Sequence, residues 1–116
     1  MDAETARALM ARRRDDIRGR LDEVDRRLAA VREARGDWTD EEHDPEGFAL
    51  THEWSQAEGA RVRLGATLRE LERAGDRVSE GSYGRCAVCD AEIPTAQLEL
   101  QPERTACVAC VDRRRR

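Results

Sequence analysis

The sequence predicts a mainly α-helical fold, in which an antiparallel two-helix coiled-coil hairpin is followed by a small module built on four cysteines. Three observations lead to it: two stretches with apolar residues at heptad spacing, a polar connection of about ten residues between them, and two Cys-x-x-Cys pairs. With 40% charged and only 3% aromatic residues, this chain of 116 residues is too polar for a thick globular core. Long, narrow helices suit that composition better.

The first predicted helix runs from about Ala3 to Arg35, and Gly36 is placed to end it. From Ile17 onward its apolar residues follow one another at steps of 4, 3, 4 and 3, which is the spacing of the a and d positions of a coiled coil. The residues expected in the core are Met10, Ile17, Leu21, Val24, Leu28 and Val31.

A second heptad stripe predicts another helix, which begins either at Asp44-Pro45 or later at Thr51 and ends at Gly81. The stripe keeps the same steps if Arg61 and Gly75 are counted as interruptions. Its expected core residues are Leu50, Trp54, Ala57, Leu64, Leu68, Leu71 and Val78.

The two predicted helices should pack antiparallel, because they have nearly equal length and a short connection. If the turn centres near Glu42, the numbers of residues that face each other sum to about 85. This rule pairs Leu28 with Ala57 and Val31 with Trp54, so the two apolar stripes agree in register. We interpret the stripe residues as core.

All four cysteines fall in two pairs, Cys86 with Cys89 and Cys107 with Cys110, with seventeen residues between the pairs. A Cys-x-x-Cys turn can direct both thiolates at one point, and two such turns supply the four ligands of a tetrahedral zinc site. The intervening segment is too short and polar to bury its own core, so metal binding should supply folding free energy on the order of 10 kcal/mol. Four thiolates leave no open coordination position. The sequence therefore predicts one structural Zn²⁺ ion and no enzyme activity.

Two other uses of the cysteines fit the sequence less well. A redox Cys-x-x-Cys needs a surrounding βαβ domain, and no such pattern is present. Disulfides need an oxidising compartment, whereas Met1-Asp2-Ala3-Glu4 has neither the basic nor the apolar region of an export signal. No apolar run approaches 18 residues. We therefore expect a cytoplasmic protein without a membrane segment.

The connection at residues 36–47 concentrates negative charge and contains no arginine, although the chain has 21 basic residues. A helix dipole favours acids at the start of a helix, which explains Asp44 better than Asp37 and Asp40. The other interpretation is a probe that delivers carboxylates to a basic or metal-containing site of a partner. The candidate partner-binding residues at this tip are Asp37, Trp38, Asp40, Glu41, Glu42 and Asp44.

The chain resembles the DksA/TraR family of bacterial transcription regulators. The motifs that carry this resemblance are Gly81-Ser82-Tyr83-Gly84-Arg85-Cys86-Ala87-Val88-Cys89, then Ile93-Pro94, Leu98, Pro102 and Cys107-Val108-Ala109-Cys110. With the helical hairpin and its acidic tip, the resemblance covers essentially the whole chain. The predicted domains are a coiled-coil hairpin at 1–80 with its tip at 36–47, and a four-cysteine zinc-finger module with a short Arg-rich tail at 81–116.

This resemblance implies a function. Members of the family bind RNA polymerase directly without reading a DNA sequence. Their hairpin enters the secondary channel and places the tip acids near the catalytic Mg²⁺ region, while the zinc module and the C-terminal helix hold the polymerase surface. Initiation at selected promoters changes as a result. The resemblance therefore implies a non-enzymatic regulator, which we expect to be a monomer.

Some features depart from the family pattern. The family tip is often Asp-x-x-Asp-x-Ala, and here Glu42 stands in place of the Ala; Glu42 to Gly47 is an alternative tip, so which carboxylate matters most stays open. In some members the alarmone ppGpp takes part, through basic residues of C-terminal regions. Only six residues follow Cys110 in this sequence, so ppGpp is left open as a ligand.

A second function class also fits the sequence: a zinc-ribbon adaptor that binds another protein, or its own copy, through the coiled coil. The four consecutive arginines at 113–116 would then touch nucleic-acid phosphate in a non-specific, salt-sensitive way, or simply be solvated. Sequence-specific DNA binding is not expected, because no segment resembles a recognition helix.

Overall fold

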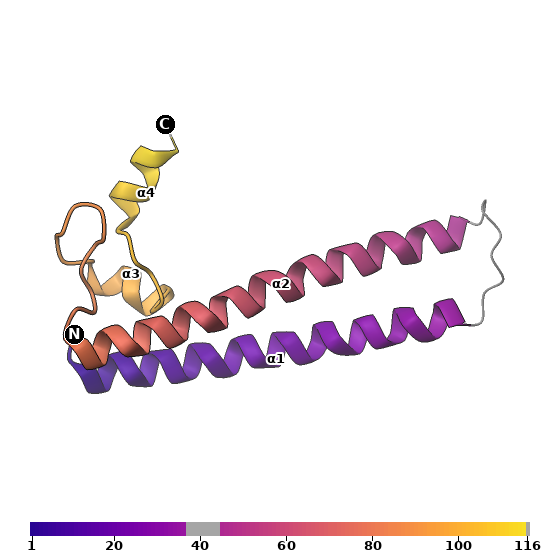
Figure 1. Ribbon diagram of the computed structural model, residues 1–116, viewed down its shortest axis with the longest axis horizontal. Coiled ribbons are helices and arrows are strands. Elements are labelled where there is room, and N and C mark those ends of the chain that lie inside the picture. Colours follow the sequence, from indigo (N-terminus) through magenta and orange to yellow (C-terminus); the bar gives the residue numbers. More distant parts are fainter. Residues whose placement is uncertain (37–44, 116) are drawn as a thin grey trace. The chain divides into compact units, whose positions relative to one another are not determined.

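The computed structural model describes residues 1–36 and 45–115, except for the side chains of 45–46, and shows four helices there (Figure 1). They are α1 (Ala3–Gly36), α2 (Pro45–Glu80), α3 (Thr95–Leu100) and α4 (Val108–Arg114). The described residues contain no strand beyond an isolated bridge between Arg85 and Glu92. The predicted fold class, a helical hairpin followed by a cysteine-bearing module, is confirmed.

The chain forms two compact units. The first combines Met1–Asp16 with Thr67–Arg116, so it holds the start of α1, the end of α2 and both short helices. The second is Ile17–Ala66. The two long helices contact each other in both units, and because the start of α1 meets the end of α2, they are antiparallel.

In the first unit, α1 and α2 share a core of Ala6 and Met10 with Leu71 and Ala74. Met10 and Leu71 are almost fully buried, at 2% and 0% exposure. Gly75, which we counted as an interruption of the second stripe, is not part of this core, and Ala74 is the buried residue between Leu71 and Val78. Steps of 3 and then 4 from Leu71 reach Val78 through Ala74, and an alanine is small enough to be overlooked as a core residue.

The start of α1 is capped by Asp2. Its carboxylate Oδ1 accepts a hydrogen bond from the backbone N–H of Thr5 at 2.7 Å, and its carbonyl accepts one from the N–H of Ala6 at 3.0 Å. This satisfies donors that have no partner within the helix. The hydrogen bond from the backbone N–H of Thr5 lowers the pKa of Asp2.

The end of α2 has the form of a Schellman motif. Gly81 has a φ of +79°, and its N–H donates to the carbonyl of Val78 at 3.3 Å while that of Ser82 donates to Arg77 at 3.0 Å. A residue without a Cβ adopts this left-handed conformation at little cost. The predicted stop at Gly81 therefore has a geometric cause, and it turns the chain toward the first cysteine pair.

In the second unit, Val24 and Leu28 of α1 pack with Ala57 of α2. Trp54, Ala60 and Leu64 complete this cluster from the same face of α2. Leu28 and Ala57, which the predicted register pairs, lie in one cluster.

Polar contacts supplement the core of this unit. Arg61 pairs with Asp25 at 3.2 Å, and the Arg32 guanidinium lies 5.6 Å from the centre of the Trp54 ring. The predicted core residue Leu21 is only half-buried. Helix α2 begins at Pro45, in agreement with the earlier of the two predicted starts.

Candidate metal centre

The first cysteine pair sits on a turn held by backbone hydrogen bonds. The N–H of Cys86 donates to Ala91 at 2.8 Å, and its carbonyl accepts from the N–H of Asp90 at 3.0 Å. Asp90 completes the turn with a φ of 61°, a left-handed conformation that aspartate tolerates better than most residues. The N–H of Ala87 donates to Thr105 at 2.8 Å, which ties this turn to the segment before the second pair.

The second cysteine pair is positioned by the start of α4. The carbonyl of Cys107 accepts hydrogen bonds from the N–H groups of Cys110 and Val111, both at 3.1 Å, so both cysteines belong to one helical turn. The side-chain carbonyl of Gln97 accepts from the N–H of Val108 at 3.0 Å. Helix α3, which carries Gln97, thereby supports the turn from outside.

These two turns bring the four cysteine sulfurs within 4.8 Å of one another. All four are free thiols, and the Sγ atoms of Cys89 and Cys107 are 3.9 Å apart. In a tetrahedral zinc site with Zn–S bonds of about 2.3 Å, the sulfurs lie about 3.8 Å from each other. The donor set and its spacing therefore fit one tetrahedrally coordinated divalent metal ion.

The environment of Cys86 favours a thiolate. Its Sγ accepts backbone N–H groups from Val88 and Cys107, both at 3.4 Å. Hydrogen bonds from the backbone of Cys89 and of Cys107 lower the pKa of Cys86 to about 6. Donors aimed at a sulfur stabilise its negative form, and that is the form in which it binds a metal.

The environment of Cys110 disfavours a thiolate in the absence of a cation. Its hydrogen bond with the thiol of Cys107, together with burial, raises the pKa of Cys110 to about 12. Sulfurs that crowd together resist becoming negative at the same time, unless a cation lies between them. The cluster thus supplies both the ligands and the electrostatic reason to hold a cation.

A small apolar core surrounds the cysteine cluster. Cys86 and Cys110 are buried with Ile93, Leu98 and Ala106. The ring of Tyr83 packs against this core and also against the core of Met10 and Leu71, so it joins the cysteine module to the helices of the same unit.

The hydroxyl of Tyr83 donates to the carbonyl of Pro102 at 2.8 Å. Burial raises the pKa of Tyr83, because its anionic form would lose solvation there. The ring therefore stays neutral and serves packing.

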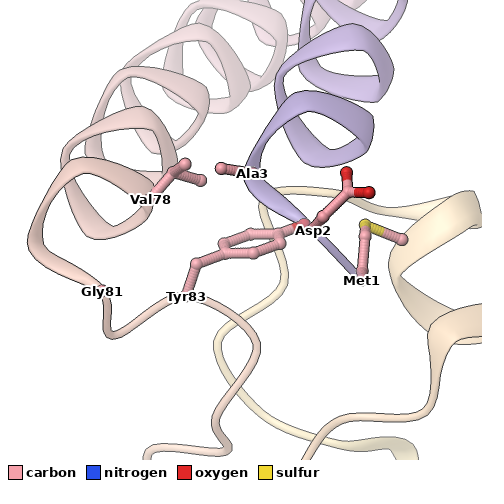
Figure 2. Close-up of a pocket in the computed structure, with 6 residues that line it drawn as sticks. All are labelled: Met1, Asp2, Ala3, Val78, Gly81 and Tyr83. Atoms are coloured by element: carbon pink, nitrogen blue, oxygen red, sulfur yellow. The ribbon is translucent and has the colours of Figure 1, made fainter.

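A cavity of about 170 Å³ lies beside Tyr83, between the start of α1 and the end of α2 (Figure 2). Its lining consists of Met1, Asp2, Ala3, Val78, Gly81 and Tyr83. The one carboxylate there, that of Asp2, already caps α1. The hydroxyl of Tyr83 is bound to Pro102, so the two polar side chains of this cavity both have partners within the protein.

The predicted tip residues lie outside the described part of the chain. They are Asp37, Trp38, Asp40, Glu41, Glu42 and Asp44. Next to the tip, Arg35 Nη2 donates to the Thr51 hydroxyl at 3.0 Å, and Phe48 in the first turn of α2 is 80% exposed. The role of the tip therefore stays a prediction.

The structure also reveals two contacts that the sequence did not predict. Arg113 Nη2 donates to Cys110 Sγ at 3.3 Å, and Arg13 Nη2 contacts Glu103 Oε2 at 3.5 Å. The first contact could have been found from a helical i, i+3 spacing next to a cysteine. The second joins residues 90 positions apart, for which the sequence offers no local signal.

This architecture can be compared with that of known proteins. No family model matches the chain. An uncharacterized protein of Aquifex aeolicus (strain VF5) is 38% identical over 47 residues, which are 40% of this chain and 32% of that protein's length. The fold of this chain is also similar to that of a solved transcription factor, DksA2 from Pseudomonas aeruginosa.

The likeness to DksA2 extends over 97% of this chain and 82% of the DksA2 chain, with a TM-score of 0.77 and 20% sequence identity. The resemblance predicted from the sequence is therefore confirmed at the level of the fold: the protein has a DksA-like fold with a cysteine cluster able to hold a metal ion. Among the described residues, no helix is both long and apolar enough to cross a bilayer.

Proposed function

We propose that this protein is a non-enzymatic transcription regulator that binds bacterial RNA polymerase directly. The observation that carries the proposal is the likeness to the transcription factor DksA2 over 97% of this chain. Because similarity of fold alone does not fix function, the acidic connection between the helices is a necessary second support. A protein of this kind acts in the cytoplasm, and as a monomer.

The proposed metal centre holds one structural Zn²⁺ ion through Cys86, Cys89, Cys107 and Cys110. Bound there, the ion supplies a cross-link between the two cysteine turns and no reaction chemistry, since all four positions are occupied by protein. The backbone N–H groups at Cys86 and the apolar core around Cys110 orient the sulfurs. The metal thus fixes the 81–116 module, which we assign to docking on the partner.

The proposed probe is the hairpin at 1–80 with its acidic tip at 36–47. Two paired helices resist bending better than one, so carboxylates at their connection can be delivered into a narrow channel as a unit. We assign the contact with the partner to Asp37, Trp38, Asp40, Glu41, Glu42 and Asp44. In this mechanism the tip provides negative charge near the polymerase's metal-containing centre, and it reads no DNA sequence.

The test is a titration of purified bacterial RNA polymerase with the metal-loaded protein, followed by measurement of open-complex lifetime. A tip-neutralised variant carries Asp37→Asn, Asp40→Asn, Glu41→Gln, Glu42→Gln and Asp44→Asn. A control variant loses the same charge from exposed positions along the helices, through Asp15→Asn, Asp22→Asn, Glu23→Gln, Glu72→Gln and Asp76→Asn.

We expect all three proteins to bind polymerase and only the tip-neutralised variant to lose its effect on the open complex. Equal effects of the two variants would contradict a special role of the tip. Absence of binding by the wild-type protein would overturn the proposal. If that protein also formed a stable dimer in sedimentation experiments, the adaptor function would be favoured instead.

A further inference from the structure

The side chain of Arg113 lies on the metal centre. It stands three residues after Cys110 on α4, which is one helical turn, and its Nη2 donates to Cys110 Sγ at 3.3 Å. Cys110 is 1% exposed, so its sulfur has little access to water as an alternative donor. The arginine therefore supplies a hydrogen bond that solvent cannot replace.

The charge of the site gives this contact its importance. Four thiolates around one divalent ion carry a net charge of −2, which is costly to hold at a buried sulfur unless donors compensate it. At Cys86 two backbone N–H groups do this. At Cys110 the donor is a guanidinium, which is always charged, and hydrogen bonds to ionised partners are about twice as strong as neutral ones.

Arg113 differs in this respect from its neighbours in the Arg-rich tail. In the part of the chain that the structure describes, the side chain of Arg114 donates no hydrogen bond to a cysteine sulfur. Both arginines lie in the last turn of α4, where positive charge is favourable to the helix dipole. A comparison of the two therefore separates an effect on the metal from an effect on the helix.

We propose that Arg113 is a positioning residue of the metal centre, whose hydrogen bond to Cys110 Sγ keeps this sulfur bound and slows release of the metal. The proposal rests on the metal site assigned above, but it does not require binding to RNA polymerase. It gives one residue of the Arg-rich tail a role within the protein.

The experiment compares Arg113→Ala and Arg113→Lys with Arg114→Ala as the matched control. Each zinc-loaded protein is mixed with excess chelator, and metal transfer is followed by the absorbance of a zinc indicator. Loss of a residue that hydrogen-bonds to a metal ligand commonly lowers metal affinity about 10- to 100-fold. Because Arg113 is largely exposed, we expect Arg113→Ala to release metal about tenfold faster than wild type. Arg114→Ala should stay close to wild type, and Arg113→Lys should lie between.

A second readout reports the sulfur itself. In the Co²⁺-substituted protein, the thiolate-to-metal charge-transfer band should move to longer wavelength in Arg113→Ala, because a sulfur without this hydrogen bond gives up electrons more easily. The band of Arg114→Ala should not move. Circular dichroism checks that all variants keep the helices.

Three results would overturn the proposal. One is release at the wild-type rate with an unmoved band in Arg113→Ala, which would leave the metal site itself intact. Another is equal acceleration by Arg113→Ala and Arg114→Ala, which would assign the effect to tail charge in general. The third is wild-type protein that contains no metal after purification under reducing conditions, and this would remove the assigned metal site as well. None of these outcomes depends on polymerase binding.

Discussion

Glu103, in the loop between α3 and α4, is 5% exposed and carries a negative charge into the interior of the first unit. Its Oε2 contacts Arg13 Nη2 at 3.5 Å, while Glu103 Oε1 and Arg13 Nε are buried without a hydrogen-bond partner among the described residues. Desolvation offsets much of the attraction in such a pair, so its net contribution to stability is small as long as both partners remain. Its main effect is to fix the loop against α1.

The pair can be tested by a double-mutant cycle at pH 7. Arg13→Met should lower the free energy of unfolding by about 2 kcal/mol, because Glu103 would stay buried without a cation. The Arg13 side chain is 23% exposed, so partial solvation makes this loss of stability smaller than for a fully buried pair. Arg13→Met combined with Glu103→Met should return to within about 1 kcal/mol of wild type. Urea unfolding of the metal-loaded wild type, the two single variants and the double variant measures the four free energies of the cycle. If the loss in the double variant equalled the sum of the losses in the single variants, the interpretation would be contradicted.

Single residues were predictable where their chemistry imposes a spacing. Cys86 and Cys110 could be assigned because two Cys-x-x-Cys pairs have few other uses, and the sulfurs do meet within 4.8 Å. Glu103 could not be assigned, because its partner lies far away in sequence and a glutamate between two cysteine pairs looks like solvent-exposed surface. Its burial depends on which side of the loop faces α1, and that is settled only by packing.

The long helices show which parts of an element follow from local sequence. Heptad spacing located Met10, Val24 and Leu28 in the core, and the structure buries all three. It missed Ala6 and Ala74, which are 1% and 0% exposed, because small residues carry little weight in an apolar pattern. These alanines are buried because α1 and α2 pack closely against each other at these positions. The stop of α2 at Gly81 was predictable, since glycine suits the left-handed residue after a helix.

The glycines of the hairpin provide a prediction at this scale. A Cβ added at Gly19 or Gly75 would meet nothing within 4 Å beyond its own helix, so alanine can gain helix propensity there without a clash. Gly19→Ala and Gly75→Ala should each raise the free energy of unfolding by up to about 1 kcal/mol. Gly81→Ala, at a φ of +79°, should instead lower it by about 1 kcal/mol. Urea midpoints of the three variants decide this, and stabilisation by Gly81→Ala would contradict the assigned cap.

For the whole molecule, the hairpin and the cysteine module were both predictable, whereas their packing was not. Hydrophobic periodicity and cysteine spacing are local properties of the chain. The role of Tyr83 is not, because its ring contacts two cores at once and its hydroxyl reaches Pro102. A boundary between hairpin and module near residue 80 stays a prediction. The contacts of Tyr83 nevertheless mean that loss of order in the module should be felt at the adjoining ends of α1 and α2.

Removal of the metal tests this coupling. A chelator under reducing conditions should unfold residues 84–115, because their small apolar core lacks the binding free energy on the order of 10 kcal/mol that a structural site supplies. Helices α3 and α4 hold 6 and 7 residues against 34 and 36 in α1 and α2, so circular dichroism should lose only a small part of its helical signal. Hydrogen-exchange mass spectrometry gives the resolution that this signal lacks.

We expect peptides from 84–115 to lose protection in the metal-free protein and peptides from 17–36 and 47–66 to keep it, because the core of Val24, Leu28 and Ala57 contains no residue of the module. Peptides with Met10 and Leu71 should show an intermediate loss, since their core remains but Tyr83 no longer covers it. A Tyr83→Phe variant with metal bound is the control, because it keeps the ring and removes only the bond to Pro102. Full protection of 84–115 without metal would show that its apolar core suffices, and the metal would then have no structural role.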